Sequence, residues 1–357
     1  MDLFDNPLGT DGFEFVEFTG PDPQSIERAF TAMGFTAVAR HRSKDVTLFK
    51  QGDINFLLNY SSESQVANFR AAHGSSVNAL AFRVRDAKQA FAEAVRRGAT
   101  PAMGAIGPME LHIPCIEGIG GAYIYLVDRY GARNIYDVDF VSIEDAGEAA
   151  NSIGLTYLDH LTHNVLRGNM AKWADYYERI FNFREIRYFD IEGKVTGLFS
   201  KAMTSPCGKI RIPLNESKGE DGKVDQIEEF LQRYNGEGIQ HIALGASDLY
   251  AVVDRLRHRG VALQDTPETY FDLIDSRLPG HGEDVSELRR RRILIDGAPS
   301  AGQGLLLQIF SQDAIGPIFF EFIQRKGNEG FGEGNFKALF ESIELDQIRR
   351  GVLQEAS

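Results

Sequence analysis

Three residues of this chain could bind one metal ion together, although they lie far apart in the sequence: His160, His241 and Glu321. Each sits in a short apolar stretch that is typical of a buried β-strand. Two histidines and one carboxylate on one face of a ferrous ion leave its other coordination positions open for substrates. The residue types therefore predict an open iron site that three separate strands assemble.

Glu321 is the most informative of the three, because a histidine in an apolar strand is more often a hydrogen-bonded core residue than a ligand. The carboxylate lies within the apolar stretch Ile318–Ile323. Burying an ionised carboxylate without a counter-charge is unfavourable. A divalent metal would supply that charge, and a plain salt bridge to Arg325 or Lys326 is the alternative.

Strand periodicity selects among neighbouring histidines. Alternate side chains of a strand point to opposite faces, so along Tyr157–Val165 His160 shares a face with Thr162. His163 points the other way. One strand should therefore supply a single histidine ligand, and the internal repeat of the chain favours His160.

The two halves of the chain repeat one order of predicted elements: a strand, a helix that ends at glycine, and further strands. Val77–Phe82 aligns with Ile239–Leu244. Tyr125–Gly131 aligns with Glu321–Gly327, with arginine and glycine in register. A repeat of this length indicates the duplication of an α+β domain rather than a solenoid.

The alignment gives each candidate ligand a counterpart in the first half that would not complete the same site. The counterparts are Glu17 for His160, Ala79 for His241 and Tyr125 for Glu321. We therefore expect a non-catalytic domain over residues 1–150, with a structural or assembly role, and a catalytic domain over residues 151–357. The linker-like stretch Glu144–Gly154 separates them.

The composition argues against several functions. A net charge of -13 over 357 residues disfavours nucleic acids and anionic membrane surfaces as partners. No apolar run approaches the roughly 18 residues of a membrane-spanning helix, and the first residues do not resemble a signal peptide. Cys115 and Cys207 lie far apart and suggest no disulfide framework. We expect a cytoplasmic protein with no membrane partner.

Two other kinds of metal site remain open. Zinc prefers a closed tetrahedron, or three ligands and water, often with a cysteine or a further histidine. Cys207 stands near the end of a candidate strand, but nothing places it beside the three residues. A metal-dependent isomerase would need a fourth, strand-borne carboxylate in the second half, and none is evident. This favours open coordination and iron.

Several stretches around these residues carry a family resemblance. They are Leu158–His160, Gly238–His241, Leu305–Phe310, Phe320–Arg325 and Gly330–Phe336. Together they resemble the 4-hydroxyphenylpyruvate dioxygenase family, most closely its bacterial members, over essentially the whole chain. The resemblance implies an α+β fold of two vicinal-oxygen-chelate (glyoxalase/bleomycin-resistance-like) domains. Each would be a pair of βαβββ modules, with the C-terminal domain curled around a metal.

The resemblance also implies the chemistry. One Fe(II) per chain would be held by His160, His241 and Glu321. The substrate would be an aromatic 2-oxo acid, 4-hydroxyphenylpyruvate, which reacts with O2 to give homogentisate and CO2. This oxidative decarboxylation with ring hydroxylation and side-chain migration belongs to tyrosine and phenylalanine catabolism. A homo-oligomer, either a dimer or a tetramer, is implied as well.

The resemblance further implies two groups of pocket residues. Those expected to act in catalysis are Ser200, Asn215, Gln240 and Gln308; those expected to bind the substrate are Pro213, Gln226, Phe310, Phe331, Asn335 and Phe336. An amphipathic helix over Asn335–Leu353 would cover the pocket. Two alternatives remain: a 4-hydroxymandelate synthase acting on the same substrate, and a non-catalytic binding protein for aromatic ligands. Pro213, Asn215 and Phe336 stand as expected for the dioxygenase.

Overall fold

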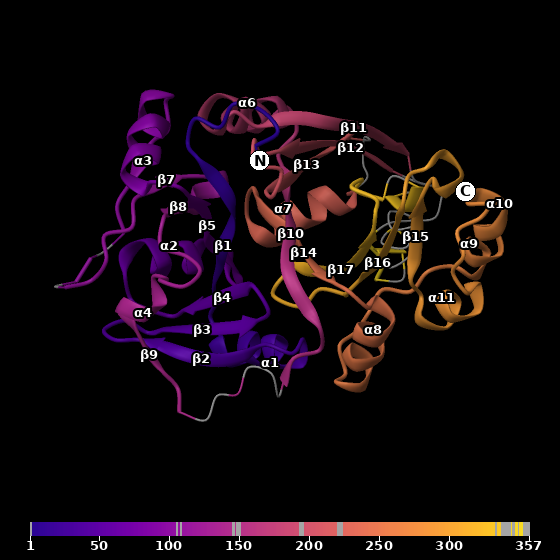
Figure 1. Cartoon of the computed structure of the whole chain (residues 1–357), viewed down its shortest axis with the longest axis horizontal. Coiled ribbons are helices and arrows are strands. Elements are labelled where there is room, and N and C mark those ends of the chain that lie inside the picture. Colours follow the sequence, from indigo (N-terminus) through magenta and orange to yellow (C-terminus); the bar gives the residue numbers. More distant parts are fainter. Residues whose placement is uncertain are drawn as a thin grey trace.

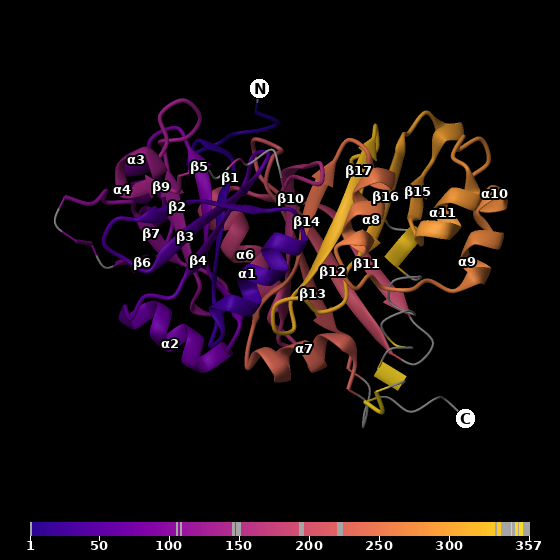
Figure 2. The same ribbon diagram turned by 90° about the horizontal axis from the view of Figure 1, so that it is seen from below.

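The computed structural model describes residues 2–352, apart from residues 105, 108, 145–146, 148–150, 193–195, 220–223, 333, 337–343, 345–346 and 349. Two β-sheets lie side by side, one from each half of the chain, and helices pack around them (Figure 1). The view from below shows the same two-part arrangement (Figure 2). The predicted α+β class is therefore confirmed.

The first sheet has the strand order β6-β7-β8-β5-β1-β4-β3-β2-β9. Its strands are β1 (Thr10–Thr19), β2 (Thr36–His41), β3 (Val46–Gln51), β4 (Ile54–Asn59), β5 (Ser76–Val84), β6 (Pro101–Ala102), β7 (Cys115–Glu117), β8 (Tyr123–Val127) and β9 (Phe140–Ser142). The helices of this half are α1 (Pro23–Ala32), α2 (Ser64–His73), α3 (Ala87–Arg96) and α4 (Tyr136–Asp139).

The second sheet has the order β11-β12-β13-β10-β14-β17-β16-β15. Its strands are β10 (Leu155–Val165), β11 (Arg184–Glu192), β12 (Gly197–Thr204), β13 (Arg211–Ser217), β14 (Gly238–Ala246), β15 (Leu294–Gly297), β16 (Leu305–Phe310) and β17 (Phe319–Lys326). Its helices are α6 (Met170–Phe181), α7 (Gln226–Tyr234), α8 (Leu249–His258), α9 (Glu268–Asp272), α10 (Ile274–Arg277) and α11 (Val285–Arg291). The last three gather beside β15 (Figures 1 and 2).

The two sheets share one pattern of strand pairing. β1 pairs in parallel with β4 and antiparallel with β5, which pairs in parallel with β8. β10 pairs in the same way with β13 and β14, and β14 pairs in parallel with β17. The predicted repeat is therefore confirmed at the level of strand pairing.

The register corrects one predicted counterpart. The paired residues are Glu17 with Ala79 and Phe15 with Ala81 in the first sheet, and Thr162 with His241 and His160 with Ala243 in the second. Since Ala79 corresponds to His241, Glu17 corresponds to Thr162, and Phe15 corresponds to His160. The prediction that Glu17 stands opposite His160 is wrong, because the register places Glu17 two residues further along, at the position of Thr162.

The third counterpart is confirmed. Tyr125 pairs with Ala81 in the first sheet, and Glu321 pairs with Ala243 in the second. The first half therefore carries Phe15, Ala79 and Tyr125 at the places of the candidate ligands, and none of these side chains is a carboxylate or an imidazole.

One hydrophobic core joins the two halves. The buried residues of α6 recur at the three- and four-residue spacing of an amphipathic helix: Met170, Trp173, Ala174, Tyr177, Ile180 and Phe181. The helix ends at Asn182, which adopts the left-handed conformation (φ 58°) that asparagine tolerates. The Phe181 ring packs against Phe82 of the first half, with centroids 5.2 Å apart. Phe320 on β17 packs against Phe56 in the same way, at 6.1 Å, so the strand of Glu321 is anchored on the first sheet.

Two further segments flank the second sheet. The chain between α8 and β15 folds into α9, α10 and α11. The helix predicted over 335–353 lies largely outside the described residues. Within the described part of the chain, helices are too short or too polar to cross a lipid bilayer.

His163 lies on the face of β10 away from His160, as predicted. Its Nε2 is 2.7 Å from the hydroxyl of Tyr177 on α6. Burial lowers the pKa of His163 to about 3, so the ring is neutral at pH 7. We expect Tyr177→Phe to lower the free energy of unfolding by about 1–3 kcal/mol, because a buried ring nitrogen loses its partner. Urea unfolding measures the change in the free energy of unfolding. The affinity for iron should stay the same in this variant. A weaker affinity would place His163 at the metal site.

Candidate metal centre

The three predicted ligands meet on neighbouring strands of the second sheet: His160 on β10, His241 on β14 and Glu321 on β17. Glu321 Oε2 lies 2.9 Å from His160 Nε2 and 3.4 Å from His241 Nε2. One ligand atom from each residue lies within 4.8 Å of the others, and all three side chains are buried. The strand pairing therefore brings together side chains that are 161 positions apart in the sequence, from His160 to Glu321.

Each histidine is oriented through its other ring nitrogen. His160 Nδ1 lies 2.8 Å from Asp159 Oδ1, and His241 Nδ1 lies 3.0 Å from Gln240 Oε1. Both oxygens only accept hydrogen bonds, so both Nδ1 atoms donate. Each Nε2 then points toward the Glu321 carboxylate, where it can carry a proton or offer a lone pair to a cation. This is how a metal-binding histidine is usually held by its outer partners.

The donor set fits a divalent cation. Two imidazole lone pairs and a carboxylate oxygen that face one another repel unless a proton or a cation lies between them. Burial raises the pKa of Glu321, but the charge and hydrogen bond of His160, followed by those of His241, lower it to about 2. The carboxylate is therefore ionised at neutral pH. Nitrogen and oxygen donors of this kind suit iron, with open positions left for substrates.

Arg325 does not pair with Glu321, so this part of the salt-bridge alternative is wrong. Its guanidinium donates to both oxygens of Asp159, with Nε–Oδ2 and Nη2–Oδ1 distances of 2.8 Å. Arg211 adds a contact of 3.1 Å to the same carboxylate. Burial opposes ionisation of Asp159, but the hydrogen bonds from Arg325 and then His160 hold its pKa well below the usual range. Asp159 is thus a buried anion that orients His160.

Gln308 fixes the second oxygen of Glu321. Its Nε2 donates to Glu321 Oε1 at 2.7 Å and to the carbonyl of Phe331 at 3.2 Å. Its Oε1 accepts from Asn335 Nδ2 at 2.7 Å. Asn335 in turn accepts from the hydroxyl of Tyr270 at 2.6 Å. This series of hydrogen bonds leaves Glu321 Oε2 directed at the two histidines.

A cavity of about 30 Å³ lies beside the three ligands. Besides them it is lined by Thr162, Ser200, Pro213, Asn215, Gln308, Phe310, Phe331 and Phe336. Ser200 and Asn215 stand opposite each other on β12 and β13. The Phe331 ring packs edge-on against His160 at 5.6 Å, and the Phe310 ring against His241 at 6.3 Å. The structure thus gathers most of the predicted pocket residues at one place.

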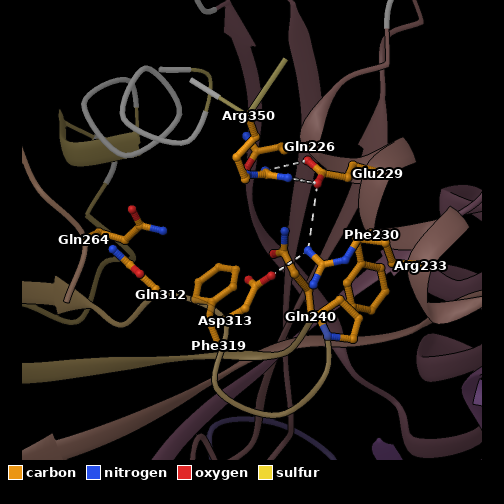
Figure 3. A pocket seen from close by; sticks show the side chains of 11 residues that line it. Gln226, Glu229, Phe230, Arg233, Gln240, Gln264, Gln312, Asp313, Phe319 and Arg350 are labelled. Carbon is orange, nitrogen blue, oxygen red and sulfur yellow. Dashed lines mark hydrogen bonds and ion pairs between the residues drawn. The ribbon is translucent and has the colours of Figure 1, made fainter. Parts of the chain in front are cut away.

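Three predicted residues lie elsewhere. Asn335 sits behind Gln308 and does not line this cavity. Gln226 and Gln240 line a neighbouring pocket of about 210 Å³ (Figure 3), together with Phe319, whose ring stacks on His241 at 4.9 Å. Their direct contact with a substrate stays a prediction. Alternation along β14 points Gln240 away from the face of its neighbour His241.

Two residues at the centre had no assigned role in the sequence. Thr162 Oγ1 lies 2.9 Å from His241 Nε2; its place on the face of His160 was the available signal. Asp159 precedes His160 directly, but its partner Arg325 follows 166 residues later. Nothing in the local pattern marks such a pairing.

Comparison with known proteins gives two family matches. Residues 4–141 match the family described as hydroxyphenylpyruvate dioxygenase, HPPD, N-terminal. Residues 157–273 match the glyoxalase/bleomycin resistance protein/dioxygenase superfamily, in agreement with the predicted vicinal-oxygen-chelate fold.

Individual relatives extend over nearly the whole chain. Hemolysin VllY of Vibrio vulnificus is 61% identical over 98% of this chain and 99% of its own length. The 4-hydroxyphenylpyruvate dioxygenase of Pseudomonas aeruginosa is also 61% identical, over 98% of this chain and 97% of its own. Among solved structures, a mutant of the 4-hydroxymandelate synthase from Streptomyces coelicolor has a TM-score of 0.82 and 25% identity, and the match covers 95% of this chain and 99% of that one.

Proposed function

The chain belongs to the 4-hydroxyphenylpyruvate dioxygenase family, and from this premise we propose that His160, His241 and Glu321 hold one ferrous ion at its reaction centre. The enzyme converts 4-hydroxyphenylpyruvate and O2 to homogentisate and CO2. The observation that supports the proposed ion most strongly is the convergence of three buried electron-pair donors within 4.8 Å. When bound, the ion would supply the redox chemistry with O2 and hold the 2-oxo acid.

The remaining lining residues suit the orientation of an aromatic ring. Phe331 and Phe310 contact the two ligand histidines and offer flat apolar surfaces next to the metal position. Ser200 and Asn215 face the same cavity from the neighbouring strands β12 and β13 and can hydrogen-bond a polar ring substituent. All four side chains are uncharged. They therefore do not compete with the anionic end of the substrate for the ion.

The enzyme must open this cavity to admit a substrate. A volume of about 30 Å³ is close to that of one water molecule in the liquid. Phe336 is the half-buried aromatic residue of the wall, and its ring packs on Phe189 with centroids 4.9 Å apart. We place the movement at Phe336, whose return would exclude water from the reacting ring.

The two halves of the chain differ in their ligand positions, and this difference bears on the domain roles and the assembly. We propose that residues 1–150 form the non-catalytic domain, that residues 151–357 form the catalytic domain, and that the chain is a homo-oligomer. Phe15, Ala79 and Tyr125 at the ligand places leave the first half free for a structural role. Sedimentation should give a dimer or a tetramer, and a monomer at high concentration would contradict the assembly.

The activity test is anaerobic loading with Fe(II), followed by 4-hydroxyphenylpyruvate and O2, with separation of the products by chromatography. We expect homogentisate. 4-Hydroxymandelate would keep the iron site and assign the chain to the synthase chemistry of its structural neighbour. Iron binding without turnover would overturn the substrate but not the ligands.

A further inference from the structure

The first half of the chain contains a second cavity, at the place that corresponds to the metal centre. Its volume is about 110 Å³, against about 30 Å³ at the ligands. Phe15 and Tyr125, the counterparts of His160 and Glu321, both line it. The duplication has thus kept the concave position in the sheet while replacing the ligands.

A buried carboxyl group points into this cavity. Glu17 is only 7% exposed and lines the cavity from β1, at the place of Thr162 in the second half. Its Oε1 accepts hydrogen bonds from Asn78 Nδ2 at 2.5 Å and from Asn59 Nδ2 at 3.0 Å. Among the described residues, its Oε2 has no hydrogen-bond partner.

A phenol group shares the cavity with this carboxyl. The half-buried Tyr125 lines it from β8, and its ring packs against Phe15 with centroids 5.8 Å apart. Within the described chain, no hydrogen bond reaches the Tyr125 hydroxyl. The Glu17 carboxyl group and the Tyr125 hydroxyl can therefore each form a further hydrogen bond with a ligand or water in the cavity.

The rest of the cavity combines apolar walls with the polar or charged side chains of His41, Lys44, Asn59, Glu63, Glu110 and Asp139. Eight apolar residues line it: Phe15, Val46, Leu57, Ile106, Leu111, Ile113, Ile135 and Phe140. An engineered apolar cavity of about 150 Å³ binds benzene, so this smaller cavity limits a ligand to one small ring. The arrangement of apolar walls with a few convergent polar groups is typical of a small-molecule site.

The charged residues that line the cavity determine which charge a ligand can carry. Lys44 is engaged by Glu63 at 3.3 Å and by Glu110 at 3.1 Å. Because Glu17, Glu63, Glu110 and Asp139 all line the cavity, a carboxylate ligand would meet four carboxyl groups and one lysine that is already paired. Burial raises the pKa of Glu17 despite the hydrogen bonds from Asn78 and Asn59, and its free oxygen can accept a hydrogen bond from a phenol hydroxyl. Both the 2-oxo acid substrate and its carboxylate product are disfavoured.

We propose that this cavity binds one small uncharged phenol, whose hydroxyl hydrogen-bonds with Glu17 and Tyr125. The site lies outside the catalytic centre and does not need the iron. It gives the first half of the chain a ligand of its own.

The solution test is calorimetric titration of the iron-loaded, full-length protein with 4-methylphenol. We expect one molecule per chain, with toluene and 4-methylbenzoate binding at least several-fold more weakly. Tyr125→Phe removes only the hydroxyl and should weaken binding about three- to tenfold, as the loss of one neutral hydrogen bond predicts. Asn215→Ala is the matched control in the catalytic cavity, and it should leave the affinity for 4-methylphenol unchanged. If Asn215→Ala weakens the binding of 4-methylphenol and Tyr125→Phe does not, the phenol binds at the iron and the proposal is overturned.

A second test needs no variant. Crystals of the unsubstituted protein are soaked with 4-bromophenol, and the bromine is located by its anomalous signal. A peak between Phe15, Glu17 and Tyr125 is expected. A peak only in the catalytic cavity, or no peak at all, would overturn the proposal.

Discussion

Replacing Glu321 by glutamine is expected to lower turnover by about a thousandfold or more and to weaken iron binding severely. Glutamine keeps the shape of the side chain but removes the only anionic donor of the three ligands. A catalytic metal contributes several kcal/mol, and each 1.36 kcal/mol changes a rate about tenfold. Iron per chain after anaerobic loading and the rate of homogentisate formation measure the two effects.

Glu14→Gln is the matched control for this substitution. Glu14 is also a buried glutamate, but it lies in the first sheet and pairs with Arg83 at 2.6 Å. We expect the control to keep its iron content, even if its stability falls. Glu321→Gln with full iron content and near-normal turnover would exclude Glu321 as a ligand.

Replacing Asp159 by alanine is expected to lower the free energy of unfolding by about 3–5 kcal/mol. Removing the carboxylate leaves the mostly buried guanidinium of Arg325 without its partner and takes one contact from Arg211. Iron affinity should also fall about 10- to 100-fold, because His160 loses the group that orients it. Urea unfolding of the metal-free protein and iron titration separate these effects.

The control for Asp159 is an aspartate whose ion pair is exposed to solvent. Asp53 pairs with Arg83 at 2.8 Å, but its side chain is 66% exposed. Asp53→Asn should change stability by less than about 1 kcal/mol, as exposed pairs do, and should leave iron affinity unchanged. If Asp159→Ala behaves like Asp53→Asn, the carboxylate has no part in positioning His160.

The sequence predicted the elements whose pattern is strong. The apolar faces of β10, β14 and β17, and the amphipathic spacing of α6, are visible without any structure because burial of one face dictates them. Helix α2 was missed, since only Val66 and Phe69 of its residues are buried and no apolar face marks it. Helix α7 was missed as well, although Asp225 caps its start through hydrogen bonds to the next turn.

Register was harder to predict than strand position. The shifts between Phe13 and Phe15 in β1, and between Leu158 and His160 in β10, cannot be seen by counting alternate residues. The sequence matched Glu17 with His160, whereas the register makes Phe15 the counterpart of His160. Glu321 and Tyr125 lie in a stretch without such a shift, and their match was predicted correctly.

The hydrogen bonds around the metal ligands could not be predicted from the sequence for a different reason. The contacts of Asp159 with Arg325 and of Gln308 with Asn335 join segments that only the folded sheet brings together. The family resemblance named Gln308 and Asn335 as pocket residues. Their hydrogen bonds suggest another role for both, which is to hold the carboxylate of Glu321 in position.

The most direct measurement is diffraction at the iron absorption edge from crystals of the anaerobically loaded protein. We expect one strong anomalous peak per chain, about 2.0–2.3 Å from His160 Nε2, His241 Nε2 and a Glu321 carboxylate oxygen, as for related divalent ions. A peak at any other place would contradict it. So would an empty site at saturating iron, with the two histidines still hydrogen-bonded directly to Glu321.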